Sequence, residues 1–168
     1  MGRVGSAEPA PTHPTITSGD PDTVTYAPAV TDTSGTTRDT TPDTSGLTIL
    51  GTTVRHAVKH LETFPAPVGC TLVRFTCEEV ASMCPVTAQP DLSTVTIAYE
   101  PAERCVESKS LKLYLWSFRD AAVFAEQLAV DVAAEVNRAA SPVWVEVIVE
   151  QRARGGIVTE TRARLPLG

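Results

Sequence analysis

Four stretches of the chain have the residue pattern of β-strands. Residues 71–77 and 143–151 alternate between apolar and polar side chains, and residues 93–99 are rich in β-branched residues. The pair Gly155-Gly156 predicts a turn, and residues 157–165 after it form the fourth predicted strand. We expect the last two strands to pair as a hairpin across this turn.

Two stretches between the second and third predicted strands have apolar residues at helical spacing. They cover residues 106–118 and the Ala-rich residues 119–140, which Pro142 follows as a helix breaker. The order β-β-α-α-β-β predicts an α+β fold. We expect an antiparallel four-stranded sheet with two helices on one face.

The first part of the chain has a different composition. Residues 1–46 are dominated by Thr, Asp, Pro, Ser and Gly, and their two Arg and six acidic residues give a net charge of -4 out of -6 for the chain. Low hydrophobicity with excess charge does not offset the entropy lost on folding. We therefore expect a disordered tail over residues 1–46 and a folded domain over residues 47–168.

The overall charge argues against several classes of partner. A net charge of -6 over 168 residues does not suit a general binder of nucleic acid or of an anionic membrane. There is no apolar run of about 18 residues and no apolar segment near the start that would resemble a secretory signal. We expect a cytoplasmic protein without nucleic-acid or membrane partners.

Of the chain's cysteines, Cys84 is the candidate for chemistry. The chain contains no C-x-x-C, so the sequence predicts no zinc site, and a cytoplasmic location argues against disulfides. Cys84 precedes Pro85 between the first two predicted strands, and Asp91 follows where the chain re-enters the sheet. Cys84 is either a buried small apolar residue or a nucleophile with a lowered pKa, and Asp91 is either a turn residue or its acid–base partner.

Glu126 is an unusual residue for its place on the predicted long helix. Its neighbours at helical spacing are alanines and valines, where a carboxylate is costly unless it is paired or used. One interpretation is a solvated flank on which Glu126 pairs with Arg119. The other is a carboxylate that binds the N–H groups of a ligand.

Two groups of cationic residues are candidate phosphate sites. Lys109 and Lys112 lie close together near the start of the shorter predicted helix, whose N–H groups also favour anions. Arg152 and Arg154, with Gly155 and Gly156, form a second cationic group at the predicted hairpin turn. Each group could equally be a solvated charged surface. No G-x-G-x-x-G or Walker-type loop is present, so a nucleotide would be held without either domain.

Three segments together resemble the nitrile reductases of the QueF family. They are SMCPVTAQPD (82–91), ESKSLKLYLWSFR (107–119) and RGGI (154–157), and LETFP (61–65) also matches. The resemblance spans roughly residues 61–157, and its length is that of the short, single-module type. It implies reduction of 7-cyano-7-deazaguanine to the 7-aminomethyl base on the route to the tRNA nucleoside queuosine.

The resemblance also implies a role for each candidate residue. Cys84 would attack the nitrile to form a thioimide, Asp91 would supply a proton, and NADPH would supply the hydrides. Glu126 would bind the guanine-like edge of the base. The remaining base-site residues would be Val106, Glu107, Ser108, Phe124 and Ala125. The cofactor residues would be Ser108, Lys109, Lys112, Arg154 and Gly155.

The resemblance further implies the tunnelling fold, in which small α+β subunits associate through their sheets into barrels. Active sites then lie between subunits, so we expect a homo-oligomer, a decamer of two pentamers. An isolated subunit would leave its sheet edges open.

One position departs from the family pattern. Members commonly have a histidine just before the helix glutamate, where this chain has Ala125. Two alternatives to the reductase therefore stay open: a relative that keeps the thioimide but transfers ammonia to form an amidine, and a non-catalytic deazapurine-binding protein. Cys84 and Asp91 argue against the non-catalytic protein, and ESKSLK and RGGI argue against the amidine-forming relative.

Overall fold

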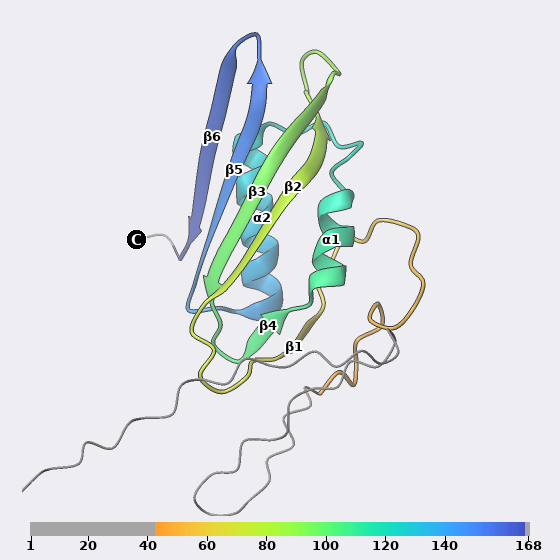
Figure 1. Ribbon diagram of the computed structural model, residues 1–168, viewed down its shortest axis with the longest axis vertical. Helices are drawn as coiled ribbons and strands as arrows, with labels where there is room; N and C mark the ends of the chain where they lie inside the picture. The colour runs from red at the N-terminus through yellow and green to blue at the C-terminus, as the bar shows by residue number, and fades with distance from the viewer. Residues whose placement is uncertain (1–42, 167–168) are drawn as a thin grey trace, which may run out of the picture. The chain divides into compact units, whose positions relative to one another are not determined.

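The computed structural model describes residues 43–166. The prediction of a disordered tail concerns mainly residues 1–42, which lie outside the described residues. Figure 1 shows the arrangement of the helices and strands. In chain order they are β1 (Thr63–Pro65), β2 (Val73–Met83), β3 (Pro90–Glu100), β4 (Arg104–Val106), α1 (Ser108–Trp116), α2 (Ala125–Ala140), β5 (Trp144–Arg154) and β6 (Ile157–Leu165).

The main sheet has four antiparallel strands in the order β2-β3-β5-β6. This confirms the predicted α+β class, the four strands and the β5–β6 hairpin. Gly155 and Gly156 make the hairpin turn with φ of 58° and 83°, a region that favours glycine. The short strands β1 and β4 form a second, two-stranded sheet that the sequence did not predict, because three-residue strands carry too little pattern.

The core lies between the main sheet and the helices. Alternate residues of β3 and β5 are fully buried against α2, whose Leu128, Val132 and Val136 are buried in turn. Burying an aliphatic side chain of this size is worth about 1.5–3 kcal/mol. Figure 1 shows α2 running behind the strands, with α1 beside β2. None of the helices in residues 43–166 is long and apolar enough to cross a membrane.

The first two strands of the main sheet extend further than the sequence predicted. β2 continues through a bulge between Cys77 and Val80 as far as Met83, and β3 already begins at Pro90. Pairing with a neighbouring strand supports residues whose own pattern is irregular. As a result, Asp91 lies within a strand, and Cys84 is the first residue after one.

The long helix starts later than predicted, at Ala125 instead of Arg119. Residues 121–123 run alongside the end of β2. The N–H of Met83 donates to the carbonyl of Ala121 at 2.9 Å, and the N–H of Val123 donates to the carbonyl of Met83 at 3.1 Å. These tertiary hydrogen bonds override the helical propensity of the alanines.

The shorter helix also differs from the prediction at its start. Val106 belongs to β4, and its N–H donates to the Tyr99 hydroxyl at 2.8 Å. Glu107 caps α1: its carboxylate accepts from the N–H groups of Lys109 and Ser110, both at 2.7 Å. A side-chain acceptor at this position satisfies free helix N–H groups.

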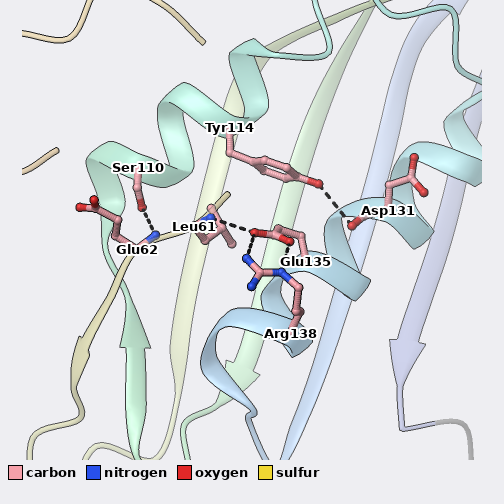
Figure 2. A network of polar contacts seen from close by, with 7 residues as sticks. All are labelled: Leu61, Glu62, Ser110, Tyr114, Asp131, Glu135 and Arg138. Atoms are coloured by element: carbon pink, nitrogen blue, oxygen red, sulfur yellow. Dashed lines mark hydrogen bonds and ion pairs between the residues drawn. The ribbon is translucent and has the colours of Figure 1, made fainter. Parts of the chain in front are cut away.

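Polar contacts fasten the segment before β1 to both helices (Figure 2). The N–H of Leu61 donates to Glu135 of α2 at 2.8 Å, and the N–H of Glu62 donates to the Ser110 hydroxyl of α1 at 3.0 Å. Arg138 holds Glu135 as an ion pair. This network positions the start of α1 relative to α2.

Candidate active site

Cys84 begins a closed loop, residues 84–89, which joins β2 to β3. Its N–H donates to the carbonyl of Gln89, and its own carbonyl accepts from the N–H of Ala88, both at 2.9 Å. Ala88 has φ of 54°, in the left-handed region that non-glycine residues rarely adopt. Unusual backbone geometry of this kind often accompanies a functional loop.

The thiol of Cys84 is prepared for ionisation. Hydrogen bonds from the Thr87 side chain, the N–H groups of Thr87 and Val86, and the Arg154 guanidinium lower its pKa to about 7. Each donor favours the thiolate over the thiol. The residue is 8% exposed, as a buried small apolar residue would be, whereas the donors around its sulfur favour the nucleophile interpretation.

Asp91 lies on the inner face of β3 and is only 2% exposed. It pairs in register with Ser82 of β2, and Ser93 is the next inward residue of β3. Oδ1 of Asp91 forms an ion pair with Nη1 of Arg154. Among the described residues, neither this oxygen nor the Ser93 hydroxyl has a hydrogen bond of regular geometry. The buried carboxylate therefore depends on Arg154 for its charge balance.

Arg154 thus lies beside the two candidate catalytic residues instead of extending freely from the hairpin. Its Nη2 donates to Oε1 of Gln151 at 2.9 Å. Gly155 follows it in the exposed turn.

The start of α2 lies at the same end of the subunit as Cys84, because residues 121–123 pair with Met83. Phe124 is 53% exposed and Glu126 is exposed, whereas Ala125 is buried. The expectation that Glu126 lies in a buried apolar stripe is therefore wrong for the single subunit, because Glu126 lies on the solvent side of the first turn of α2. The expected ion pair with Arg119 is not among those of the described residues.

Val106, Glu107 and Ser108 lie at the opposite end, where β4 leads into α1 (Figure 1). Val106 and Glu107 are buried, and Ser108 is exposed. The Glu107 carboxylate is already engaged as the cap of α1. A single subunit thus separates these three predicted base-site residues from Cys84.

The two predicted cofactor lysines differ in their surroundings. The ammonium group of Lys109 donates to the carbonyls of Ile49, at 2.8 Å, and Thr52. Lys112 is exposed and lines a hollow of about 380 Å³ between α1 and β2. The other residues of this hollow are Cys77, Glu79, Val80, Ala81, Leu115, Trp116 and Arg119. Its walls thus combine apolar side chains and an indole with two cations and the carboxylate of Glu79.

Several residues of these sites were missed from the sequence. Gln151 of β5 and Ser93 of β3 occupy inward positions, where the alternating pattern of each strand otherwise places apolar residues. A polar residue at such a position could have marked them as candidates. Trp116 and Arg119 belong to the ESKSLKLYLWSFR segment, but the sequence alone did not place them in a hollow. Nothing in the sequence marks Thr87 as a partner of the thiol.

Comparison with known proteins decides the family. A family model described as "QueF-like protein" matches residues 90–166. Over 108 residues the chain is 45% identical to the NADPH-dependent 7-cyano-7-deazaguanine reductase of Anaeromyxobacter sp. (strain Fw109-5), covering 63% of this chain and 88% of that protein. The chain belongs to the QueF family.

Further members support the assignment. A reductase of the same description from Frankia casuarinae is 43% identical over 111 residues, covering 66% of this chain and 89% of that protein. Among solved structures, the apo form of the archaeosine synthase QueF-Like superposes with a TM-score of 0.53 at 29% identity, covering 56% of this chain and 92% of that one. The predicted tunnelling fold of the QueF family is thereby confirmed for the subunit.

Proposed function

We propose that this protein reduces the nitrile of 7-cyano-7-deazaguanine to the 7-aminomethyl base with NADPH, through a covalent thioimide on Cys84, in the queuosine pathway. The observation that carries the proposal is a buried cysteine, whose hydrogen-bond donors favour the thiolate, near a buried aspartate that pairs with one of those donors, Arg154. Relatives about 45% identical to this chain are described as reductases of this substrate.

The first step joins Cys84 to the nitrile carbon. Asp91 takes the thiol proton, and the thiolate forms a C–S bond while one π bond of the C≡N group breaks. The electron pair moves to nitrogen, which receives the proton back from Asp91. The thiol has then added across the nitrile to give the thioimide, with no change in oxidation state.

Two reductions then convert the thioimide to the amine. NADPH, when bound, supplies one hydride in each reduction. After the first, the C–S bond breaks, Cys84 recovers its thiol proton, and an imine remains in the site. Each hydride is matched by one proton, so two hydrides and two protons are added to the nitrile. Asp91 would transfer these protons, and its ion pair with Arg154, which is also a donor to Cys84, supports this role.

The base would be held by the exposed start of α2. Glu126 would accept hydrogen bonds from the N–H groups of the guanine-like edge, and Phe124 would cover the ring. Val106, Glu107 and Ser108 would complete this site from a second subunit, since they lie at the other end of their own.

This division of the site supports a homo-oligomer with active sites between subunits. The outer strands of the main sheet, β2 and β6, have one neighbour each among the described strands, and such edges favour pairing with another chain. The assembly we propose is a barrel built from paired pentamers.

A direct assay tests the function. Adding 7-cyano-7-deazaguanine to the protein and NADPH should lower the NADPH absorbance, and mass spectrometry should identify the aminomethyl product. Two NADPH oxidised per amine are expected. No oxidation by a folded protein would reject the reductase.

A second candidate keeps the covalent step but transfers ammonia in place of hydride. The observation that favours it is the structural neighbour, which is described as an archaeosine synthase. The higher identity to the reductases argues for hydride transfer. An amidine formed with ammonia, and no NADPH oxidation, would decide for this candidate.

A further inference from the structure

Arg154 makes contacts that a role in phosphate binding does not explain. Nη1 forms an ion pair with Asp91, and Nη2 donates to the side-chain oxygen of Gln151 at 2.9 Å. The same guanidinium is among the donors that lower the pKa of Cys84, after the side chain and N–H of Thr87 and the N–H of Val86. The arginine thus joins β5 to both side chains that carry the proposed chemistry.

The backbone is shaped to bring Arg154 there. Gln151 is buried on the inner face of β5, and residues three apart in a regular strand point to opposite faces. The register between β5 and β6 shifts between Gln151 and Arg154, which marks a β-bulge. A bulge re-aims the side chain that follows it, so Arg154 turns back to the side of Gln151 and Asp91.

The charges at this point need a cation. Asp91 is 2% exposed, and a buried carboxylate is costly unless paired. Transfer of the thiol proton to Asp91 moves this negative charge from the carboxylate to the sulfur of Cys84, so the site needs a cation in either state. A guanidinium presents five N–H groups in a planar fork, so it can contact the carboxylate and the sulfur while Gln151 fixes its orientation.

We propose that Arg154 is a positioning residue that holds Asp91 and the sulfur of Cys84 together at the end of the sheet, before substrate or cofactor binds. The proposal rests on the proposed function only for the reaction that the pair performs. It assigns to Arg154 a role different from binding the phosphates of NADPH, and it makes the β5 bulge part of the active site.

The test measures Cys84 ionisation without nitrile or NADPH. The full-length protein is alkylated with iodoacetamide over a range of pH, and the Cys84 peptide is quantified by mass spectrometry. In the wild-type protein, the rate of Cys84 alkylation should reach half of its maximum near pH 7, which is the midpoint. Arg154→Gln should move the midpoint upward, and a rise of about one unit would slow alkylation at pH 7 about fivefold. Arg154→Lys should retain part of the effect.

Matched variants separate the explanations. Arg152→Gln removes the same charge from an exposed position on β5, and its midpoint should equal that of wild type. Gln151→Ala should shift the midpoint in the same direction as Arg154→Gln by a smaller amount, and it keeps the test available if Arg154→Gln does not fold. In turnover, Arg154→Gln should lower kcat with little change in KM for NADPH.

The opposite pattern would overturn the proposal. A folded Arg154→Gln with the wild-type midpoint and a raised KM for NADPH would return Arg154 to a cofactor role. Failure of the proposed function would look different: wild type would not oxidise NADPH, while the alkylation midpoints would still follow Arg154.

Discussion

The side chain of Thr87 hydrogen-bonds to the sulfur of Cys84, and this contact is the largest cause of the lowered pKa of the thiol. Both residues belong to the loop that the Cys84–Gln89 backbone hydrogen bond closes. The loop therefore fixes the donor and the sulfur relative to each other. Local structure therefore favours the thiolate of Cys84, the proposed nucleophile, without any ligand.

Thr87→Val should raise the pKa of Cys84 from about 7 toward the ordinary thiol value of about 8.5. Because the thiolate is the nucleophile, its rate of alkylation rises as pH passes the pKa, and the variant should need a higher pH. At pH 7 the rate should fall by up to about 15-fold. Thr71→Val, at an exposed position before β2, serves as the control and should behave as wild type. An unchanged midpoint in Thr87→Val would show that the Thr87 hydroxyl does not lower the pKa of Cys84.

Tyr99→Phe should destabilise the subunit by about 1–3 kcal/mol. The hydroxyl of this fully buried residue accepts from the N–H of Val106 at 2.8 Å, and the change leaves a buried donor without its partner. Urea unfolding at fixed protein concentration measures the loss. Tyr114→Phe is the matched control, since its hydroxyl donates to a carbonyl of α2 at 3.3 Å. Equal stability losses for the two variants would contradict the importance of the Val106 contact.

Glu62→Gln should destabilise the protein in a pH-dependent way. Burial alone would raise the pKa of this carboxyl, but hydrogen bonds from Thr48 and Ile49 and the charge of His60 leave it lowered. A lowered folded pKa gives stability above the unfolded value of about 4.3, and this stability is lost as pH falls through the folded pKa.

Unfolding free energies at pH 7 and at about pH 3.5 test this prediction. The loss in Glu62→Gln should be about 1.5–3 kcal/mol at pH 7, the value of a hydrogen bond to a charged group, and it should shrink at the lower pH. Glu78→Gln changes an exposed carboxylate on β2 and should have little effect. A loss for Glu62→Gln that does not vary with pH would show that its charge is unimportant.

Glu126→Leu should weaken base binding without harming the fold. The carboxylate is exposed on the subunit, whereas a lost charge-assisted contact to the base costs about 1.5–3 kcal/mol per bond, or roughly 10–150-fold in Kd. Calorimetric titration with 7-cyano-7-deazaguanine in a Cys84→Ala background measures non-covalent binding. Asp120→Asn, another exposed acid nearby, is the control. Undiminished binding by Glu126→Leu would make Glu126 a solvated flank residue.

The fold could be predicted largely because periodicity reports burial. The apolar residues that alternate along β5, and those that recur every four residues in α2, are the residues that are buried. The boundaries failed where tertiary contacts decide them: Met83 pairs with residues 121–123 and delays α2, and Tyr99 holds Val106 in β4. Local patterns carry no information on such contacts.

The candidate site was predictable in its residue types but not in its arrangement. The motifs singled out Cys84, Asp91 and Arg154, yet no spacing rule shows that a β-bulge turns Arg154 onto Asp91. Nor could the sequence show that Ala125 is buried, with its carbonyl accepting a hydrogen bond from the Thr161 hydroxyl at 3.1 Å. The separation of Glu107 from Cys84 follows from the direction of α1, which only the fold defines.

The most direct measurement is the mass of the protein after incubation with 7-cyano-7-deazaguanine in the absence of NADPH. Addition of a thiol across a nitrile expels no group, so the protein should gain the full mass of the nitrile. The gain should map to the Cys84 peptide and disappear when NADPH is added. A folded Cys84→Ala should show no adduct. An adduct of equal yield in Cys84→Ala, or none on Cys84 in an active wild-type enzyme, would contradict covalent capture by this cysteine.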